Sequence, residues 1–205
     1  MTSSAHLASN GSKLLTVLIP FKNERDEVAR TCKSVRDTAG DRVDIIVLND
    51  DSDKDYDYRT ALQPYDVEYH ESDHRLGSSM GKQRCVDLCR TPYFLILDAH
   101  CRIYTPDWLD RALAVLSRNE NCIYCCAVQY FSDETDHQSP NHMKAYGGFW
   151  DYNVKSILSC AWNTKNLLPV NKYIRKSKWT FDIPCILGAN YLCSKRWWNH
   201  IDGFN

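Results

Sequence analysis

Three apolar runs stand out along the chain, and each run stops abruptly at a cluster of polar residues. The runs occupy residues 14–20, 43–48 and 93–97, and they are rich in β-branched, leucine and aromatic side chains. A short run that is almost entirely apolar is typical of a strand that is buried on both faces of a sheet. The pattern therefore predicts three buried strands.

Helical patterns separate these runs. Val28, Cys32 and Val35 recur on one face of a predicted helix that ends near Asp37, and a glycine-punctuated loop at residues 74–89 leads into a second helix. The other predicted elements are helices at 56–62, 105–117 and from 194, and strands at 67–69 and 123–130. This alternation predicts an α/β fold with a mostly parallel, Rossmann-like sheet and helices on both faces.

Polar residues follow each of the three buried runs. Asn23 and Glu24 come after the first run, residues 49–53 after the second, and Asp98-Ala99-His100 after the third. The carboxyl ends of parallel strands form the ligand-binding edge of such a sheet. Asp98 and His100 can turn toward one ion there, although either residue could also be a loop residue that faces water.

The chemistry of this edge is narrowed by two missing motifs. The chain has neither G-x-G-x-x-G after its first strand nor G-x-x-x-x-G-K-[ST], which argues against a classical dinucleotide site and a P-loop. Acidic residues at two strand ends would repel a diphosphate unless a cation lay between them. Asp98 with His100 suits Mn²⁺ or Mg²⁺ better than structural Zn²⁺, which prefers thiolates.

Composition is that of an ordinary globular protein. A net charge of -1 and 43% hydrophobic residues argue against a dedicated binder of nucleic acid or membrane surfaces. No stretch is long and apolar enough to span a bilayer, and residues 1–12 lack the features of a secretory signal. We expect a disordered leader at 1–12, one domain at 13–205, and a cytoplasmic protein whose ten cysteines are free thiols.

Five segments, in this order, resemble a known family: VLIPFKNE, IIVLNDDSD, HRLGSSMGKQRC, FLILDAHC and ILGANYLCSKRWWNHIDGFN. Together they are similar to family-two type glycosyltransferases with the GT-A fold, and most similar to the catalytic domain of polypeptide N-acetylgalactosaminyltransferases. The resemblance runs from Thr16 to Asn205. Its most specific feature is aspartate-x-histidine where aspartate-x-aspartate is commoner.

The resemblance implies a metal-dependent hexosyl- or N-acetylhexosaminyltransferase that uses a nucleotide-sugar donor, most simply a UDP-sugar. Asp98 and His100 would be catalytic residues that hold Mn²⁺ or Mg²⁺ against the donor diphosphate. Other positions would bind the nucleotide or the donor sugar. They are Pro20, Phe21 and Glu24 in the nucleotide pocket, Asn49 and Asp50 at the uracil or ribose, Arg75 and Lys82 at the base or diphosphate, and Gly188, Ala189 and Asn190 beneath the sugar.

The chain departs from the family pattern at three points. Arg102 follows DAHC where an acid is common, Gly188-Ala189 replaces a Gly-Gly pair, and the chain stops at Asn205, so the domain is expected to be incomplete at its C-terminus. No acid between residues 131 and 205 stands in a recognisable acceptor motif, which favours retention of anomeric configuration. Glu24 could instead favour a helix start, and Arg75 could be a solvated loop charge.

Two other functions remain compatible with the sequence. A sugar nucleotidyltransferase would need a Gly- and Arg-rich loop after the first strand, where this chain has PFKNE. The basic, aromatic stretch at 165–178 could contact nucleic acid, as a binding module or as the acceptor site of a transferase, or it could be a solvated loop. Protein, polysaccharide, lipid and nucleic-acid acceptors all remain open.

Overall fold

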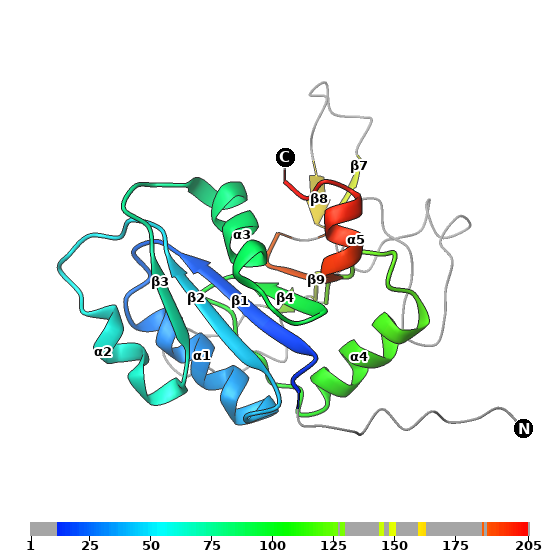
Figure 1. Cartoon of the computed structure of the whole chain (residues 1–205), viewed down its shortest axis with the longest axis horizontal. Coiled ribbons are helices and arrows are strands. Elements are labelled where there is room, and N and C mark those ends of the chain that lie inside the picture. Colours follow the sequence, from blue (N-terminus) through cyan, green and yellow to red (C-terminus); the bar gives the residue numbers. More distant parts are fainter. Residues whose placement is uncertain are drawn as a thin grey trace, which may run out of the picture.

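The computed structural model describes residues 12–126, 128–129, 144–145, 148–150, 160–162, 186 and 188–204. At its centre lies a five-stranded sheet with the order β3-β2-β1-β4-β9 (Figure 1). Four strands are parallel, namely β1 (Leu15–Phe21), β2 (Asp44–Asn49), β3 (Glu68–Glu71) and β4 (Tyr93–Leu97). The fifth, β9 (Asn190–Ser194), is antiparallel to β4. The predicted mostly parallel α/β sheet is confirmed.

Helices cover both faces of the sheet, as predicted. On one face, α1 (Asp26–Ala39) and α4 (Trp108–Arg118) share a core with alternate strand residues such as Val17 and Leu95. On the other face, α3 (Gly77–Leu88) and α5 (Lys195–His200) pack on the intervening residues, such as Leu18 and Phe94. Burial on both faces explains why the strands read as continuous apolar runs.

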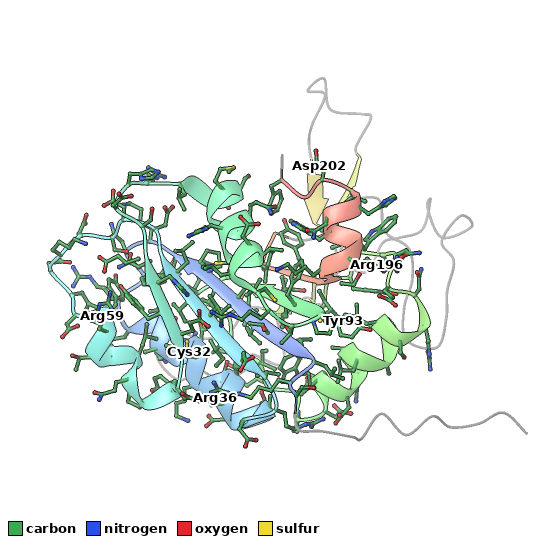
Figure 2. All side chains as sticks on the ribbon, in the orientation of Figure 1. Cys32, Arg36, Arg59, Tyr93, Arg196 and Asp202 are labelled. Atoms are coloured by element: carbon green, nitrogen blue, oxygen red, sulfur yellow. The ribbon has the colours of Figure 1, made fainter. Side chains whose placement is uncertain are left out.

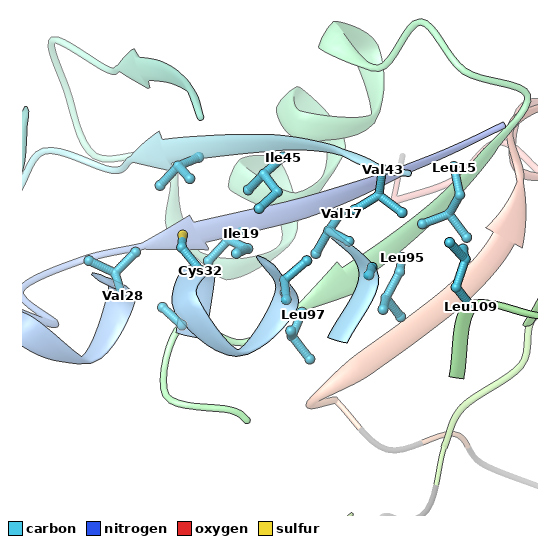
Figure 3. Packing of buried hydrophobic residues seen from close by; sticks show 14 of the residues in the cluster. Leu15, Val17, Ile19, Val28, Cys32, Val43, Ile45, Leu95, Leu97 and Leu109 are labelled. Atoms are coloured by element: carbon cyan, nitrogen blue, oxygen red, sulfur yellow. The ribbon is translucent and has the colours of Figure 1, made fainter. Parts of the chain in front are cut away.

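The larger core lies between the sheet and α1. Val28 and Cys32 of α1 pack against the strand residues Val17, Ile19 and Ile45, and all five are at most 1% exposed (Figure 3). The helical spacing recognised in the sequence is therefore the face that α1 turns to the sheet. A short helix α2 (Tyr58–Leu62) and one turn of 3-10 helix (Gln63–Tyr65) lead from β2 to β3.

Arg36, in the last turn of α1, binds the loops that lead into β2 and β3 (Figure 2). Its guanidinium donates hydrogen bonds to the carbonyls of Tyr65 at 2.8 Å, Asp66 at 2.7 Å, Gly40 at 2.7 Å and Val43 at 2.9 Å. A cation is favourable at a helix C-terminus, where carbonyls lack helical partners. Arg36 thereby fixes the chain where it enters β2 and β3.

The predicted strand at residues 123–130 is wrong in its extent. Tyr124 forms one isolated bridge with Leu192, and β5 (Val128–Gln129) pairs with β6 (Lys144–Ala145) outside the central sheet. A second small pair joins β7 (Gly148–Trp150) to β8 (Cys160–Trp162). Beside the bridge, the Asn190 side chain binds the main chain of Cys126, which replaces regular strand pairing. Residues 1–11 and the basic stretch 165–178 lie outside the described residues.

The structure describes the side chains of eight of the ten cysteines, and all eight are free thiols, as predicted. Burial raises the pKa of Cys32 and of Cys193 to about 12, so both thiols stay protonated at neutral pH. A protonated thiol is neither a good nucleophile nor a metal ligand. Cys32 and Cys193 therefore act as core side chains.

In the part of the chain that is described, no helix has the length and apolar character needed to cross a membrane.

Candidate active site

The loops after β1 and β2 are hydrogen-bonded to each other. The Asp50 N–H donates to the Phe21 carbonyl at 2.8 Å, and the Asn23 N–H donates to the Ser52 hydroxyl at 2.9 Å. Asn23 also accepts the Asp53 N–H at 2.8 Å through its side-chain oxygen. Asn23 has a φ of 58°, a left-handed conformation that asparagine tolerates better than most residues. These hydrogen bonds hold the ends of β1 and β2 together as one surface.

Asp50 holds the start of α3. Its two carboxylate oxygens accept the N–H groups of Leu76 at 2.6 Å and Gly77 at 2.9 Å, and the residue is buried. A carboxylate is favoured there because the first helical N–H groups have no partner within the helix. Asn49 is also engaged, since it donates to the Tyr69 hydroxyl at 2.9 Å and accepts the Ser52 N–H at 3.0 Å. Base contact by either residue stays a prediction.

Lys82 of α3 lies against Asp98. Its Nζ is 3.6 Å from an Asp98 carboxylate oxygen and donates to the Gly188 carbonyl at 3.1 Å. It also lies 5.1 Å from the ring centroid of Tyr191, within the range of a cation–π contact. The Lys82 side chain is only 10% exposed, whereas that of Asp98 is 29% exposed. A nearly buried ammonium therefore faces an aspartate that solutes can still reach.

His100 contacts Glu24 across the strand edge. The Nδ1 atom of His100 is 3.2 Å from a Glu24 carboxylate oxygen, and the His100 side chain is 59% exposed. β1 and β4 are neighbouring parallel strands, so the residues that follow them meet at the same edge. The sequence suggested Glu24 for the nucleotide pocket but not as the partner of His100. Adjacency of the first and fourth strands was the signal that could have revealed it.

The segment before β9 completes the site. The Asp98 N–H donates to the Ala189 carbonyl at 2.9 Å, which places Gly188 and Ala189 beside Asp98 and Lys82. A Cβ built on Gly188 would meet the Tyr191 hydroxyl oxygen at 3.9 Å, an ordinary contact, so the described neighbours leave room for a side chain there. Asn190 is buried, and its side-chain oxygen accepts the Cys126 N–H at 2.5 Å. Its amide braces β9.

Three further residues predicted for the nucleotide site differ in their surroundings. The ring of Phe21 is buried 4.6 Å from the ring of Tyr58, so it supports the strand end from within the core. Pro20 lies beside Gly81 of α3, where a Cβ on the glycine would approach it to 3.7 Å. Arg75 is exposed just before α3 begins. Phe21 is therefore a core residue, Pro20 lies against α3, and Arg75 is open to solvent.

The donor atoms at this edge suit a hard divalent cation. Asp98 and His100 supply a carboxylate and an imidazole, and Glu24 adds a second carboxylate beside His100. Among the described residues, no three His, Cys, Asp or Glu side chains form a ready-made metal cage. Mg²⁺-type sites commonly use one or two protein ligands and take the rest from substrate phosphates and water. The residues fit that kind of site.

A protein-family model described as Glycosyl transferase family 2 matches residues 16–197. Mannosyltransferase PcManGT from Pyrobaculum calidifontis, solved with GDP-Man and Mn²⁺, is 17% identical with a TM-score of 0.50, over 57% of this chain and 36% of that one. S. aureus TarS 1-349 is 14% identical with a TM-score of 0.45, over 51% and 32%. TarS 1-349 was also solved with UDP.

The structural comparison bears on the fold of this chain. At 17% identity, the likeness to the mannosyltransferase concerns the fold, and it agrees with the GT-A architecture expected from the sequence. The chain spans about a third of the length of the solved structures that it matches. No curated protein sequence matches the chain.

Proposed function

The chain belongs to glycosyl transferase family 2, and we propose that it transfers a sugar from a UDP-sugar donor to an acceptor with the help of Mn²⁺ or Mg²⁺. The observation that carries the proposal is that two pairs of polar side chains, Lys82 with Asp98 and His100 with Glu24, lie at the carboxyl edge of the neighbouring strands β1 and β4. Both signs of charge stand within hydrogen-bonding or ion-pairing distance there. That arrangement suits a cation and a diphosphate bound side by side.

In this proposal Asp98 and His100 hold the cation, and Glu24 orients the His100 imidazole through its 3.2 Å contact. A bound divalent ion supplies Lewis-acid stabilisation of the departing diphosphate. Lys82 adds a fixed positive charge at the same pole, where its low exposure strengthens its interaction with developing negative charge. The mannosyltransferase solved with GDP-Man and Mn²⁺ supports a divalent ion in this fold.

The nucleotide half of the donor is proposed to lie along the joined loops after β1 and β2. Asp50 keeps lone pairs beyond those that accept the α3 N–H groups, and they can accept the N3–H of uracil. Arg75 is exposed beside this loop and can reach a phosphate or the base. The surface that would contact the nucleotide includes Pro20, Phe21 and Asn49. The donor sugar would lie over Gly188 and Ala189, beside Asp98.

We further propose retention of anomeric configuration. The bond from the sugar C1 to the diphosphate oxygen breaks, a bond from C1 to the acceptor oxygen forms on the same face, and the acceptor proton passes to the released diphosphate. An inverting route would need a carboxylate opposite the leaving group as base. The acids considered for that role, Asp133, Glu134, Asp136, Asp151 and Asp182, lie outside the described residues.

The first prediction is that UDP binding requires a divalent ion. Calorimetric titration with UDP should give a measurable affinity in Mn²⁺ and at least a tenfold weaker one in EDTA, because the edge acids repel an unneutralised diphosphate. GDP in Mn²⁺ should bind more weakly than UDP. Equal UDP affinity in Mn²⁺ and EDTA would contradict the metal role, and GDP binding as tightly as UDP would contradict uracil recognition.

The second prediction concerns the product. A screen of UDP-hexoses and UDP-N-acetylhexosamines against protein, polysaccharide, lipid and nucleic-acid acceptors identifies the sugar and the acceptor. Both a hexose and an N-acetylhexosamine are candidates for the donor sugar, and the four acceptor classes stay open. Proton NMR of the product from an α-linked donor should show an α-linkage. A β-linked product would rule out retention.

A further inference from the structure

One buried hydroxyl lies beneath the Asp98-Ala99-His100 turn. The Oγ1 of Thr31, on α1, is 2.6 Å from the Ala99 carbonyl oxygen and 2.8 Å from that of Cys101. Its single proton is therefore shared between the two carbonyls that flank His100. Thr31 is fully buried, so water does not compete for these bonds.

Arg102 reinforces the same contact. Its guanidinium donates to Thr31 Oγ1 and to the Cys101 carbonyl, both at 3.1 Å, and to a Glu27 carboxylate oxygen at 2.6 Å. The Arg102 side chain is only 2% exposed. Its charge is therefore directed into α1, away from the candidate cation site. Arginine at this position, where similar transferases often carry an acid, finds its counter-charge in Glu27.

The orientation of the exposed His100 imidazole depends on the main chain that Thr31 binds. With a side chain that is 59% exposed, His100 receives little orientation from packing, and its direction depends on the main chain and on Glu24. The main chain on both sides of it is tied to α1 through Thr31, and Ser34 of the same helix accepts the Ile103 N–H at 3.1 Å. α1 packs on the sheet whose strand β4 leads into Asp98. Both candidate ligands, Asp98 and His100, are therefore held by the same packed unit of α1 and the sheet.

We propose that Thr31 is a positioning residue: through the Ala99 and Cys101 carbonyls it holds His100 in the orientation that binds a divalent cation together with Asp98. Arg102 supports Thr31 in this role. The inference rests on the proposed function, because it assigns a task within the same cation site. Hydrogen-bonded partners behind metal ligands commonly contribute 10- to 100-fold to metal affinity.

The test compares Thr31→Val, Thr31→Ser and Thr38→Val with the unaltered chain. Valine keeps the size and branching of threonine and removes the hydroxyl, while serine keeps the hydroxyl. Thr38 is the matched control, because it lies on the same helix, and its hydroxyl accepts the Trp108 Nε1–H at 3.0 Å, outside the Asp98–Arg102 segment. Thermal melting of all variants reports the general loss of stability.

Two measurements separate positioning from stability. Hydrogen exchange of the metal-free protein should show amides of the 98–104 segment exchanging roughly tenfold faster in Thr31→Val, because two carbonyl anchors are lost. Electron paramagnetic resonance of Mn²⁺ at saturating UDP should show about tenfold weaker Mn²⁺ binding in that variant. Thr31→Ser and Thr38→Val should match the unaltered chain in both measurements.

The outcomes are distinct. Unchanged exchange at 98–104 in Thr31→Val overturns the positioning role, as does unchanged Mn²⁺ affinity in a chain that binds Mn²⁺. An unaltered chain that binds no Mn²⁺ with UDP overturns the proposed function and this role with it. If Thr31→Val does not fold, Arg102→Lys provides the second variant: it keeps the charge beside Glu27 but cannot bridge Thr31 and Cys101, and the same two changes are expected.

Discussion

Replacing Asp98 with asparagine is expected to lower the transfer rate by about 100- to 1,000-fold. The carboxylate is the candidate ligand with both a neighbouring cation, Lys82, and access to solutes, so its charge is available to a divalent ion. Asparagine keeps the size of the side chain and removes that charge. Steady-state rates with a UDP-sugar, with Mn²⁺ at several concentrations, measure the effect.

Asparagine is a sharper test than alanine because of what the structure adds. The Asp98 carboxylate lies 3.6 Å from the Lys82 ammonium, whose side chain is 10% exposed; asparagine keeps a side-chain oxygen that can face this ammonium, whereas alanine would leave none. His100→Ala should reduce the rate similarly, and the double variant should lose little more, because two ligands of one ion act as a unit.

Asp110→Asn is the control for both variants. Asp110 pairs with Arg42 on the exposed surface of α4, so the same chemical change there should leave the rate unaltered. Near-normal transfer by Asp98→Asn would show that the cation is held elsewhere.

Replacing Lys82 with methionine is expected to weaken UDP binding and to reduce the transfer rate by about 100-fold. Methionine retains much of the lysine stem and loses the ammonium, and with it the cation–π contact with Tyr191. The Gly188 carbonyl and the Asp98 carboxylate then face one another without a cation between them. Lys82→Arg should recover part of the activity, because it restores the charge with a different geometry.

Lys195→Met gives a matched control for this prediction. Lys195 also donates through Nζ to a main-chain carbonyl, that of Cys89, but it lies at the start of α5 outside the cluster. Both variants should lose stability to a similar extent, which thermal melting measures. Only Lys82→Met should change UDP affinity in calorimetry. Equal UDP affinity in both variants would remove Lys82 from the donor site.

The sequence was most informative where a local pattern determines structure. Buried parallel strands require nearly continuous apolar runs, so β1, β2 and β4 were located to within one residue, and the polar residues at their ends do lie at one edge of the sheet. The extent of the strand predicted at 123–130 was wrong because pairing there depends on β9, which lies far away in the chain. The Asn190 amide, which binds Cys126, could not be anticipated from alternation of residue types.

Pairings within the site were beyond the reach of sequence patterns for the same reason. Glu24 with His100, and Thr31 with the carbonyls of Ala99 and Cys101, join residues about 70 positions apart. Thr31 looked like an ordinary helical residue, since nothing in its neighbourhood marks a hydroxyl that serves another element. Asp50 carried a recognisable acidic signal, but the sequence could not show that its carboxylate holds the start of α3.

The antiparallel strand β9 has a consequence for how the chain acquires its site during folding. The hydrogen bond from Lys82 to Gly188 joins residues 106 positions apart, and β9 closes on β4 with a similar separation. Contacts between residues so far apart in the sequence form slowly, because closing the long loop between them costs conformational entropy before the contact can stabilise the chain. A nascent chain that has emerged only to residue 126 already holds β1 to β4 and the Asp98 turn, yet it lacks the segment that Lys82 and Asp98 hold. Assembly of the candidate site is therefore expected to be a late event of folding, which occurs only when β9 has been synthesised and has paired with β4.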